Sequence, residues 1–385
     1  MAIHRSRISV IAAAGAAGLA LSACGGGNSE ADTSGGTHKV GVILPLSGPG
    51  SLIGKDTESA LKVFQEIDPG AEGLNITYIV CDDETTPTGA STCARKLVQQ
   101  DNVDMVYGPI FAGMFEGAKP VLQNGPPSIT SSPYSVPPAN SSIFAASGAA
   151  LDLDRTTLEF AKERGYKKVA VLATTDHTGQ TALENIKEVN KDLGLDITVE
   201  TMGPADADVS AQLTKLKQGD PDYIYVAAAG AAGGVALKGM DQQGMDIPTA
   251  MIWSNTTSSF FDASRQFLPT ELVFAMSPSW LPDELDDAEK AKQVKDLQAG
   301  FEKETGSEIS FVVQGAYDSF QLINATLKES GGDKEKGLKY LSNLENFDGL
   351  NWTISYTPED HRGSNSSNYV MMRYDGDSDS WSTSK

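Results

Sequence analysis

Acids, lysines, histidines and hydroxyl residues occur throughout this sequence, but their spacing fits no common catalytic motif. Gly54-Lys55 resembles part of a phosphate-binding loop, yet that motif needs a glycine where Pro49 stands and a hydroxyl residue where Asp56 stands. The GxSxG and HExxH motifs do not occur. None of the four histidines has an obvious nucleophile or metal-ligand partner at a useful spacing. The sequence therefore predicts no catalytic residue, no metal and no cofactor.

A different set of residues recurs in the turns that follow apolar, β-like segments. These turns consist of small and hydroxyl residues with a few aromatic ones nearby, which suits a small organic ligand better than a reaction. In open α/β sheets ligands bind at the carboxyl ends of strands, where helix N-termini present free N–H groups. A single Ser or Thr at such a place is more often a helix cap, so the hypothesis depends on the whole set. The candidate ligand-binding residues are Ser47, Ser51, Phe111, Ala112, Gly113, Thr130, Ser131, Ser132, Asp176, His177, Thr178, Ala229, Trp253, Asn255, Trp280 and Tyr317.

The elements that would position these turns alternate between short apolar strands and amphipathic helices. Near-continuous apolar strands separated by helices indicate parallel sheets covered on both faces. Four such units come before about residue 148 and four after it, which predicts an α/β fold of two doubly wound lobes. The predicted strands are 39–44, 74–80, 103–108, 126–130, 167–173, 195–200, 222–228, 248–253 and 272–276. The predicted helices are 54–67, 90–100, 113–123, 151–164, 180–193, 210–218, 233–243 and 257–266.

The C-terminal part departs from this alternation. Residues 286–305, 311–329 and 334–344 have helical patterns, and two strands joined by a polar turn are predicted after them. We therefore expect the chain to return from the second lobe to the first and to cross back, which forms a multi-strand hinge that closes around a ligand. The predicted division is 38–148 plus about 278–352 for lobe 1, and about 149–277 plus about 353–385 for lobe 2.

The N-terminal segment predicts export from the cytoplasm. A basic start and a short apolar stretch indicate a signal peptide over 1–23. Small residues before Cys24 and a flexible polar tether over 24–37 resemble the lipobox of bacterial lipoproteins, which implies lipid on Cys24. An ordinary signal peptide followed by a chance cysteine is the alternative. The predicted location is the extracytoplasmic face of the cell membrane, with the lipid as anchor.

The remaining two cysteines and the charge narrow the possibilities further. Cys81 and Cys93 are left as a pair in an oxidising compartment, where a structural disulfide is expected; a metal site would need further ligands. The formal charge is −21, or about −23 once the signal peptide and its two arginines are removed. A protein this acidic repels phosphate backbones, which argues against nucleic acid as a partner.

Several stretches resemble solute-binding proteins of the branched-chain amino acid, amide and urea ABC importers. They include KVGVILPLSGPGSLIGKDTESALKVFQEI, CDDETTPTGASTCARKLVQQDNVDMVYGP, KKVAVLATTDHTGQTALENIK, DVSAQLTKLKQGDPDYIYVAA and SEISFVVQGAYDSFQLINATLKESGG. The resemblance runs from about His38 to the end. It implies a type I periplasmic-binding-protein fold with three hinge crossings. It also implies capture of a solute and its delivery to a membrane permease without catalysis.

The ligand residues of that family are only partly present. Where the family has two serines after its third strand, this sequence has Phe111 and Ala112, and where it often has Asp-x-Tyr-Gly, this sequence has His177-Thr178 before the glycine. Where amino-acid binders place an acid for the α-ammonium, residues 254–256 are Ser, Asn and Thr. Burying an ammonium or carboxylate without such partners costs several kcal/mol. An aromatic acid or an amide is therefore predicted in preference to a free α-amino acid.

The resulting prediction is a monomeric, lipid-anchored solute-binding protein of an ABC importer, which captures by lobe closure a small organic solute of the amino acid, amide or aromatic acid class. Its partners are a small-molecule solute, the importer's permease subunits and the membrane. A ligand sensor of the same fold is the first alternative, and a secreted hydrolase is the second.

Overall fold

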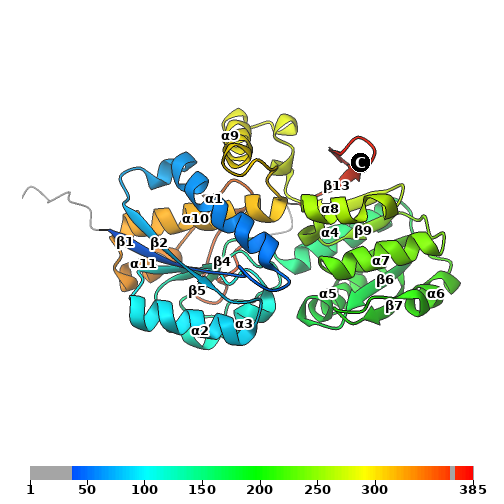
Figure 1. Cartoon of the computed structure of the whole chain (residues 1–385), viewed down its shortest axis with the longest axis horizontal. Coiled ribbons are helices and arrows are strands. Elements are labelled where there is room, and N and C mark those ends of the chain that lie inside the picture. Colours follow the sequence, from blue (N-terminus) through cyan, green and yellow to red (C-terminus); the bar gives the residue numbers. More distant parts are fainter. Residues whose placement is uncertain (1–36, 365–368, 385) are drawn as a thin grey trace, which may run out of the picture. The chain divides into compact units, whose positions relative to one another are not determined.

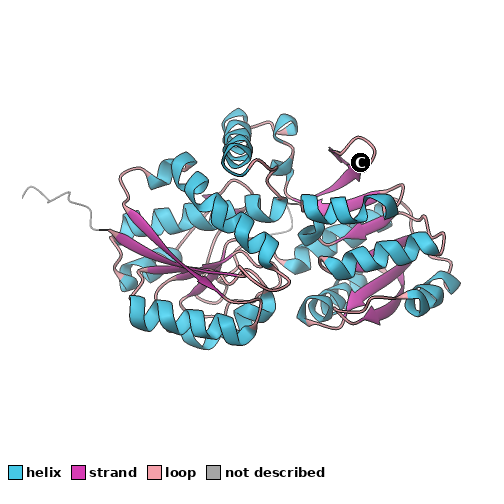
Figure 2. Ribbon diagram, viewed as in Figure 1, coloured by secondary structure: helices cyan, strands magenta, loops and turns pink. Residues whose placement is uncertain are grey.

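The computed structural model of this chain describes residues 37–364 and 369–384. The predicted signal peptide and Cys24 lie outside the described residues, as does all but the end of the predicted tether. Two separate sheets of mostly parallel strands are each covered by helices, as Figure 2 shows. The predicted α/β fold of two parallel-sheet lobes is confirmed.

The first lobe contains a five-stranded parallel sheet in the order β2-β1-β3-β4-β5. Its central strands are apolar and buried, as expected for a sheet with helices on both faces. In Figure 1, α1 and α10 cover one face, while α2 and α3 cover the other. The strands are β1 (His38–Leu44), β2 (Ile76–Asp82), β3 (Met105–Tyr107), β4 (Ser128–Thr130) and β5 (Ile143–Ala145). The helices are α1 (Ser51–Ile67), α2 (Pro87–Lys96), α3 (Ala112–Leu122), α10 (Phe311–Ser330) and α11 (Lys334–Leu341).

The second lobe contains a seven-stranded sheet in the order β14-β13-β10-β9-β8-β6-β7. Its five N-terminal strands are parallel, and β13 runs antiparallel to both β10 and β14. Helices α4 and α5 pack against each other, and α7 packs against α6 and α8. The strands are β6 (Lys168–Thr174), β7 (Asp196–Met202), β8 (Tyr223–Ala227), β9 (Thr249–Met251), β10 (Leu272–Met276), β13 (Val370–Asp375) and β14 (Ser380–Thr383). The helices are α4 (Ala150–Glu163), α5 (His177–Leu193), α6 (Ser210–Gln218), α7 (Ala231–Gln242) and α8 (Ser258–Ser264).

The C-terminal part differs from the prediction of two strands joined by one polar turn. Strand β12 (Thr353–Ile354) pairs with β11 (Phe347–Asp348), which follows the helices α9 (Ala288–Thr305), α10 and α11. The next strand, β13, joins the second sheet instead. The reason is that residues 356–361 form hydrogen bonds with β5. For example, the Tyr356 hydroxyl donates to the Ala145 carbonyl at 2.9 Å. The predicted boundary between lobe 1 and lobe 2 near residue 353 stays a prediction. Residues after 353 still contact the first sheet, through Tyr356 and its bond to β5.

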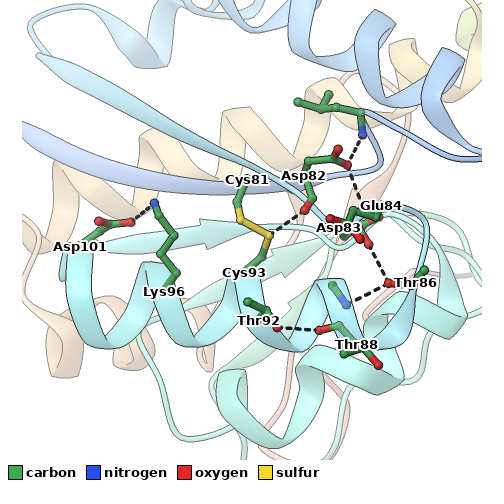
Figure 3. The surroundings of a disulfide bond; sticks show 12 residues. Cys81, Asp82, Asp83, Glu84, Thr86, Thr88, Thr92, Cys93, Lys96 and Asp101 are labelled. Atoms are coloured by element: carbon green, nitrogen blue, oxygen red, sulfur yellow. Dashed lines mark hydrogen bonds and ion pairs between the residues drawn. A yellow bond between two sulfur atoms is a disulfide. The ribbon is translucent and has the colours of Figure 1, made fainter.

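The predicted disulfide between Cys81 and Cys93 is confirmed. Figure 3 shows that it joins the end of β2 to the middle of α2. Next to it, one Asp82 carboxylate oxygen accepts hydrogen bonds from the backbone N–H groups of residues 46, 47 and 84. The disulfide and this carboxylate together hold the turn after β1 against the start of α2.

Within residues 37–364 and 369–384, no helix is both long enough and apolar enough to span a membrane. No cluster of His, Cys, Asp and Glu side chains suited to a metal ion occurs in the same residues.

Candidate functional site

A pocket opens where the carboxyl ends of strands from both sheets meet the start of α10. It encloses about 640 Å³ of space not filled by atoms, counting the open space at its mouth. The contributing turns follow β3, β4 and β5 of the first sheet, and β6, β8 and β9 of the second. This is the place where parallel α/β sheets bind ligands. The pocket is lined by Ile110, Phe111, Ala112, Ser131, Ser132, Pro133, Tyr134, Ser147, Thr178, Ala229, Trp253, Ser254, Phe311, Val312, Gly315 and Trp352.

The structure brings together part of the set of candidate residues. Those that line the pocket come from both lobes, so that the two halves of the fold face one common space. They are Phe111, Ala112, Ser131, Ser132, Thr178, Ala229 and Trp253.

Three further candidates have polar groups that already bond to the protein: Thr130 and Asn255 bond to a neighbouring turn, and Asp176 bonds within its own. The Thr130 hydroxyl donates to the Pro109 carbonyl at 2.7 Å. The Asn255 side chain donates to the Ala228 carbonyl at 2.8 Å and accepts from the Gly230 N–H at 2.6 Å. Asp176 caps the N-terminus of α5. These side chains shape the turns of the pocket without lining it.

The other candidates lie outside the pocket lining. Ser47 and His177 are exposed, Ser51 and Gly113 lie in the first turns of α1 and α3, and Tyr317 is buried against Phe64. Trp280 packs edge-on against the aromatic rings of residues 311 and 381. None of these side chains borders the space between the turns.

Several lining residues were not among the candidates. Ser147 follows β5, a strand of only three residues that the periodicity does not reveal. Phe311 and Trp352 come from the C-terminal part, far from the strand–turn–helix units in sequence. The tryptophan reaches the pocket because the buried Asp318 carboxylate accepts the backbone N–H groups of residues 351 and 352.

Helix α3 points an uncapped N-terminus at the pocket. Its N-cap position is Phe111, which provides no side-chain acceptor, so the first N–H groups of α3 have no side-chain partner. Gly108, before the turn, has φ +88, and a Cβ there would lie 2.4 Å from the Ile43 carbonyl oxygen, so that only glycine fits. Free N–H groups and the positive end of the helix dipole favour an anionic ligand group.

An aromatic cluster also lines the pocket. The Trp253 ring lies 5.2 Å from that of Phe311 and 5.5 Å from that of Trp352, between ring centroids. The three residues come from the second lobe, from α10 and from the segment after it. Such a surface favours stacking or edge-on contact with another ring.

Some polar atoms at the pocket have no hydrogen-bond partner among the described residues. They are the Ser254 hydroxyl and the Trp352 indole nitrogen. The Tyr134 hydroxyl lies close to that of Tyr225, which donates to the buried Asp154 carboxylate at 2.6 Å. Burial raises the pKa of Asp154 to about 7. Unpaired buried polar atoms are costly, so they mark where a ligand would supply hydrogen bonds.

Among the described residues, none that lines the pocket carries a charge. An α-ammonium group bound there would therefore have no carboxylate partner in the lining. The pocket combines an electropositive helix end, several hydroxyls and an aromatic surface.

A family model described as periplasmic binding protein matches residues 37–379. The leucine-, isoleucine-, valine-, threonine- and alanine-binding protein of Pseudomonas aeruginosa is 24% identical over 320 residues, covering 78% of this chain and 80% of that protein. An extracellular ligand-binding receptor from Rhodopseudomonas palustris has a similar crystal structure, with a TM-score of 0.80 and 21% identity over 91% of this chain and 100% of that chain. A solute-binding protein of an ABC transporter from the same species, solved with 3,4-dihydroxybenzoic acid, has a TM-score of 0.68 and 24% identity over 88% of this chain and 92% of that chain.

Proposed function

Because the chain belongs to the periplasmic binding protein family, a family of binding proteins rather than enzymes, we propose that it captures a small aromatic acid between its two lobes. It then delivers this solute to the membrane subunits of an ABC importer. The observation that supports this ligand class is the pocket itself, which is lined both by an uncapped helix N-terminus and by an aromatic cluster.

Each part of an aromatic acid has a suitable partner in this pocket. The carboxylate would accept hydrogen bonds from the N–H groups at the start of α3 and from nearby serine hydroxyls. The ring would contact Trp253 and Trp352, and the unpaired Ser254 hydroxyl would meet a polar ring substituent. One structural neighbour was solved with 3,4-dihydroxybenzoic acid, which is a ligand of this class.

A free α-amino acid suits the pocket less well, although one relative is named for binding leucine and similar amino acids. Its ammonium group would be buried without a carboxylate among the described lining residues. That arrangement costs several kcal/mol. We therefore place leucine below aromatic acids as a ligand.

Thermal-shift screening of the purified protein tests this proposal. The panel contains 3,4-dihydroxybenzoate, its primary amide, leucine, urea and aliphatic carboxylates. A ligand present at a hundred times its Kd adds about 2.7 kcal/mol of stability, so true ligands produce clear shifts. The aromatic acid is expected to give the largest shift and to be recovered unchanged, whereas a largest shift with leucine contradicts the proposal.

We also propose that lipid on Cys24 anchors the protein, as a monomer, to the extracytoplasmic face of the membrane. The support is the sequence of residues 1–37 alone. Replacing Cys24 by Ala is expected to move the protein from the membrane fraction to the soluble extracytoplasmic fraction. Unchanged fractionation would contradict lipid anchoring and leave the ligand proposal intact.

A further inference from the structure

One arginine lies directly behind the pocket wall, outside the candidate set. Arg362 belongs to the segment that runs along β5 before the chain enters the second sheet. One terminal guanidinium nitrogen donates to the Ser132 and Ser135 carbonyls. The other donates to the Gly148 carbonyl and the Ser147 hydroxyl, both at 3.2 Å, and lies 3.4 Å from the Ser147 carbonyl oxygen. The guanidinium therefore holds two pocket turns, those after β4 and β5.

This guanidinium has an unusual electrostatic position. Within residues 37–364 and 369–384 it forms no ion pair with a carboxylate; Asp152 and Asp360 act on it only at longer range. Its hydrogen bonds go to neutral carbonyl and hydroxyl oxygens instead. Desolvation by burial lowers the pKa of Arg362, but a guanidinium keeps its proton at neutral pH. Among the described residues, the positive charge beside the pocket is thus offset only at longer range, by Asp152 and Asp360.

The contact between Arg362 and Ser147 determines whether the Ser147 hydroxyl acts as a donor or as an acceptor toward a ligand in the pocket. A guanidinium can only donate, so the Ser147 oxygen must act as the acceptor in their 3.2 Å contact. The hydroxyl proton of Ser147, a buried residue that lines the pocket, is then free to be donated to a ligand. A bond accepted from a cation also polarises the hydroxyl and makes it a stronger donor.

We propose that Arg362 is the specificity-determining cation of this site, acting through Ser147 to make it select a carboxylate over the amide of the same shape. This inference rests on the proposed function, and it identifies the carboxylate as the ligand group that the site recognises. An amide presents only one acceptor oxygen and no charge, so it gains less from this arrangement. Arg362 is a positioning residue in this role, because Ser147, and not Arg362, lines the pocket.

Calorimetric titration with 3,4-dihydroxybenzoate and with its primary amide tests this inference. The quantity of interest is the ratio of the two dissociation constants, since a structural disturbance of the pocket weakens both ligands together. We expect the wild type to prefer the acid, and Ser147→Ala to reduce that preference at least about tenfold, the lower end of what a hydrogen bond to a charged group contributes. Arg362→Gln is expected to reduce it at least as much.

Arg362→Lys is the matched control, because it keeps the charge but loses the planar fork. It should retain more of the acid preference than Arg362→Gln does. An acid-to-amide ratio that stays at the wild-type value in Ser147→Ala overturns the inference, even if Arg362→Gln folds poorly. A wild-type protein that binds neither ligand would instead contradict the proposed function, and this inference with it.

Discussion

The two walls of the pocket use their polar residues differently. On the first-lobe wall, the N–H groups at the start of α3 and the Ser147 hydroxyl have capacity left for a ligand. On the second-lobe wall, Asp176 caps α5 and Asn255 bonds to the turn after β8, which leaves the Ser254 hydroxyl beside the ring of Trp253. Under the proposed function, the first wall binds the charged end of the ligand, while the second wall contacts its ring and a polar substituent.

Placing a negative charge on the first wall should have the largest effect. Ala112 is the first residue of α3 and lines the pocket, so Ala112→Asp would set a carboxylate against that of the ligand. Repulsion of about 3 kcal/mol at an effective dielectric constant near 20 predicts a loss of affinity of about a hundredfold. An acid near a helix N-terminus stabilises the helix, so the variant should fold. Ala112→Asn is the neutral control, and equal affinities for the two variants in calorimetry would refute the assignment of this wall.

Removing the aromatic surface of the second wall should have a smaller effect. Trp253→Leu keeps an apolar side chain but loses the ring that faces residues 311 and 352. We expect the affinity for an aromatic acid to fall about tenfold, since ring–ring contacts contribute about 0.5–1.5 kcal/mol beyond their buried area. Trp253→Phe should lie between this variant and the wild type. If Trp253→Leu bound an aromatic acid as tightly as the wild type does, the ring of the ligand would not contact Trp253.

The buried acid behind the pocket should affect stability rather than affinity. The pKa of Asp154 is raised to about 7, so its protonated form is favoured in the folded state, and the stability it contributes is lost as pH rises toward and through 7. Wild type should therefore lose roughly 2–3 kcal/mol of stability relative to Asp154→Asn between pH 5 and pH 8, measured by urea unfolding. Parallel stability curves for the two proteins would show that Asp154 does not titrate in this range.

The sequence predicts the lobes well because burial on both faces leaves a direct pattern of apolar residues. Strand β8, for example, is buried at every position. The short strands β11 and β12 carry no such pattern, and the partners of Tyr356 lie on a strand more than two hundred residues earlier. The spacing of apolar residues indicates which positions are buried. It does not indicate which distant strand provides the hydrogen-bond partner of a residue such as Tyr356.

The site is harder to predict than the fold for a related reason. A hydroxyl or amide in a turn can bond to the backbone of a neighbouring turn, as Thr130 and Asn255 do, or remain available, as Ser254 does. Residue type and spacing are the same in both cases. Trp352 illustrates a second difficulty, because its place in the pocket depends on the Asp318 carboxylate of a different element.

Direct calorimetric comparison of 3,4-dihydroxybenzoate and leucine, titrated into the same purified protein, tests the central claim that this pocket binds an aromatic acid. The pocket described above predicts one molecule of the aromatic acid per chain, bound at least about tenfold more tightly than leucine, because leucine buries an ammonium group without a partner. Tighter binding of leucine would contradict the claim.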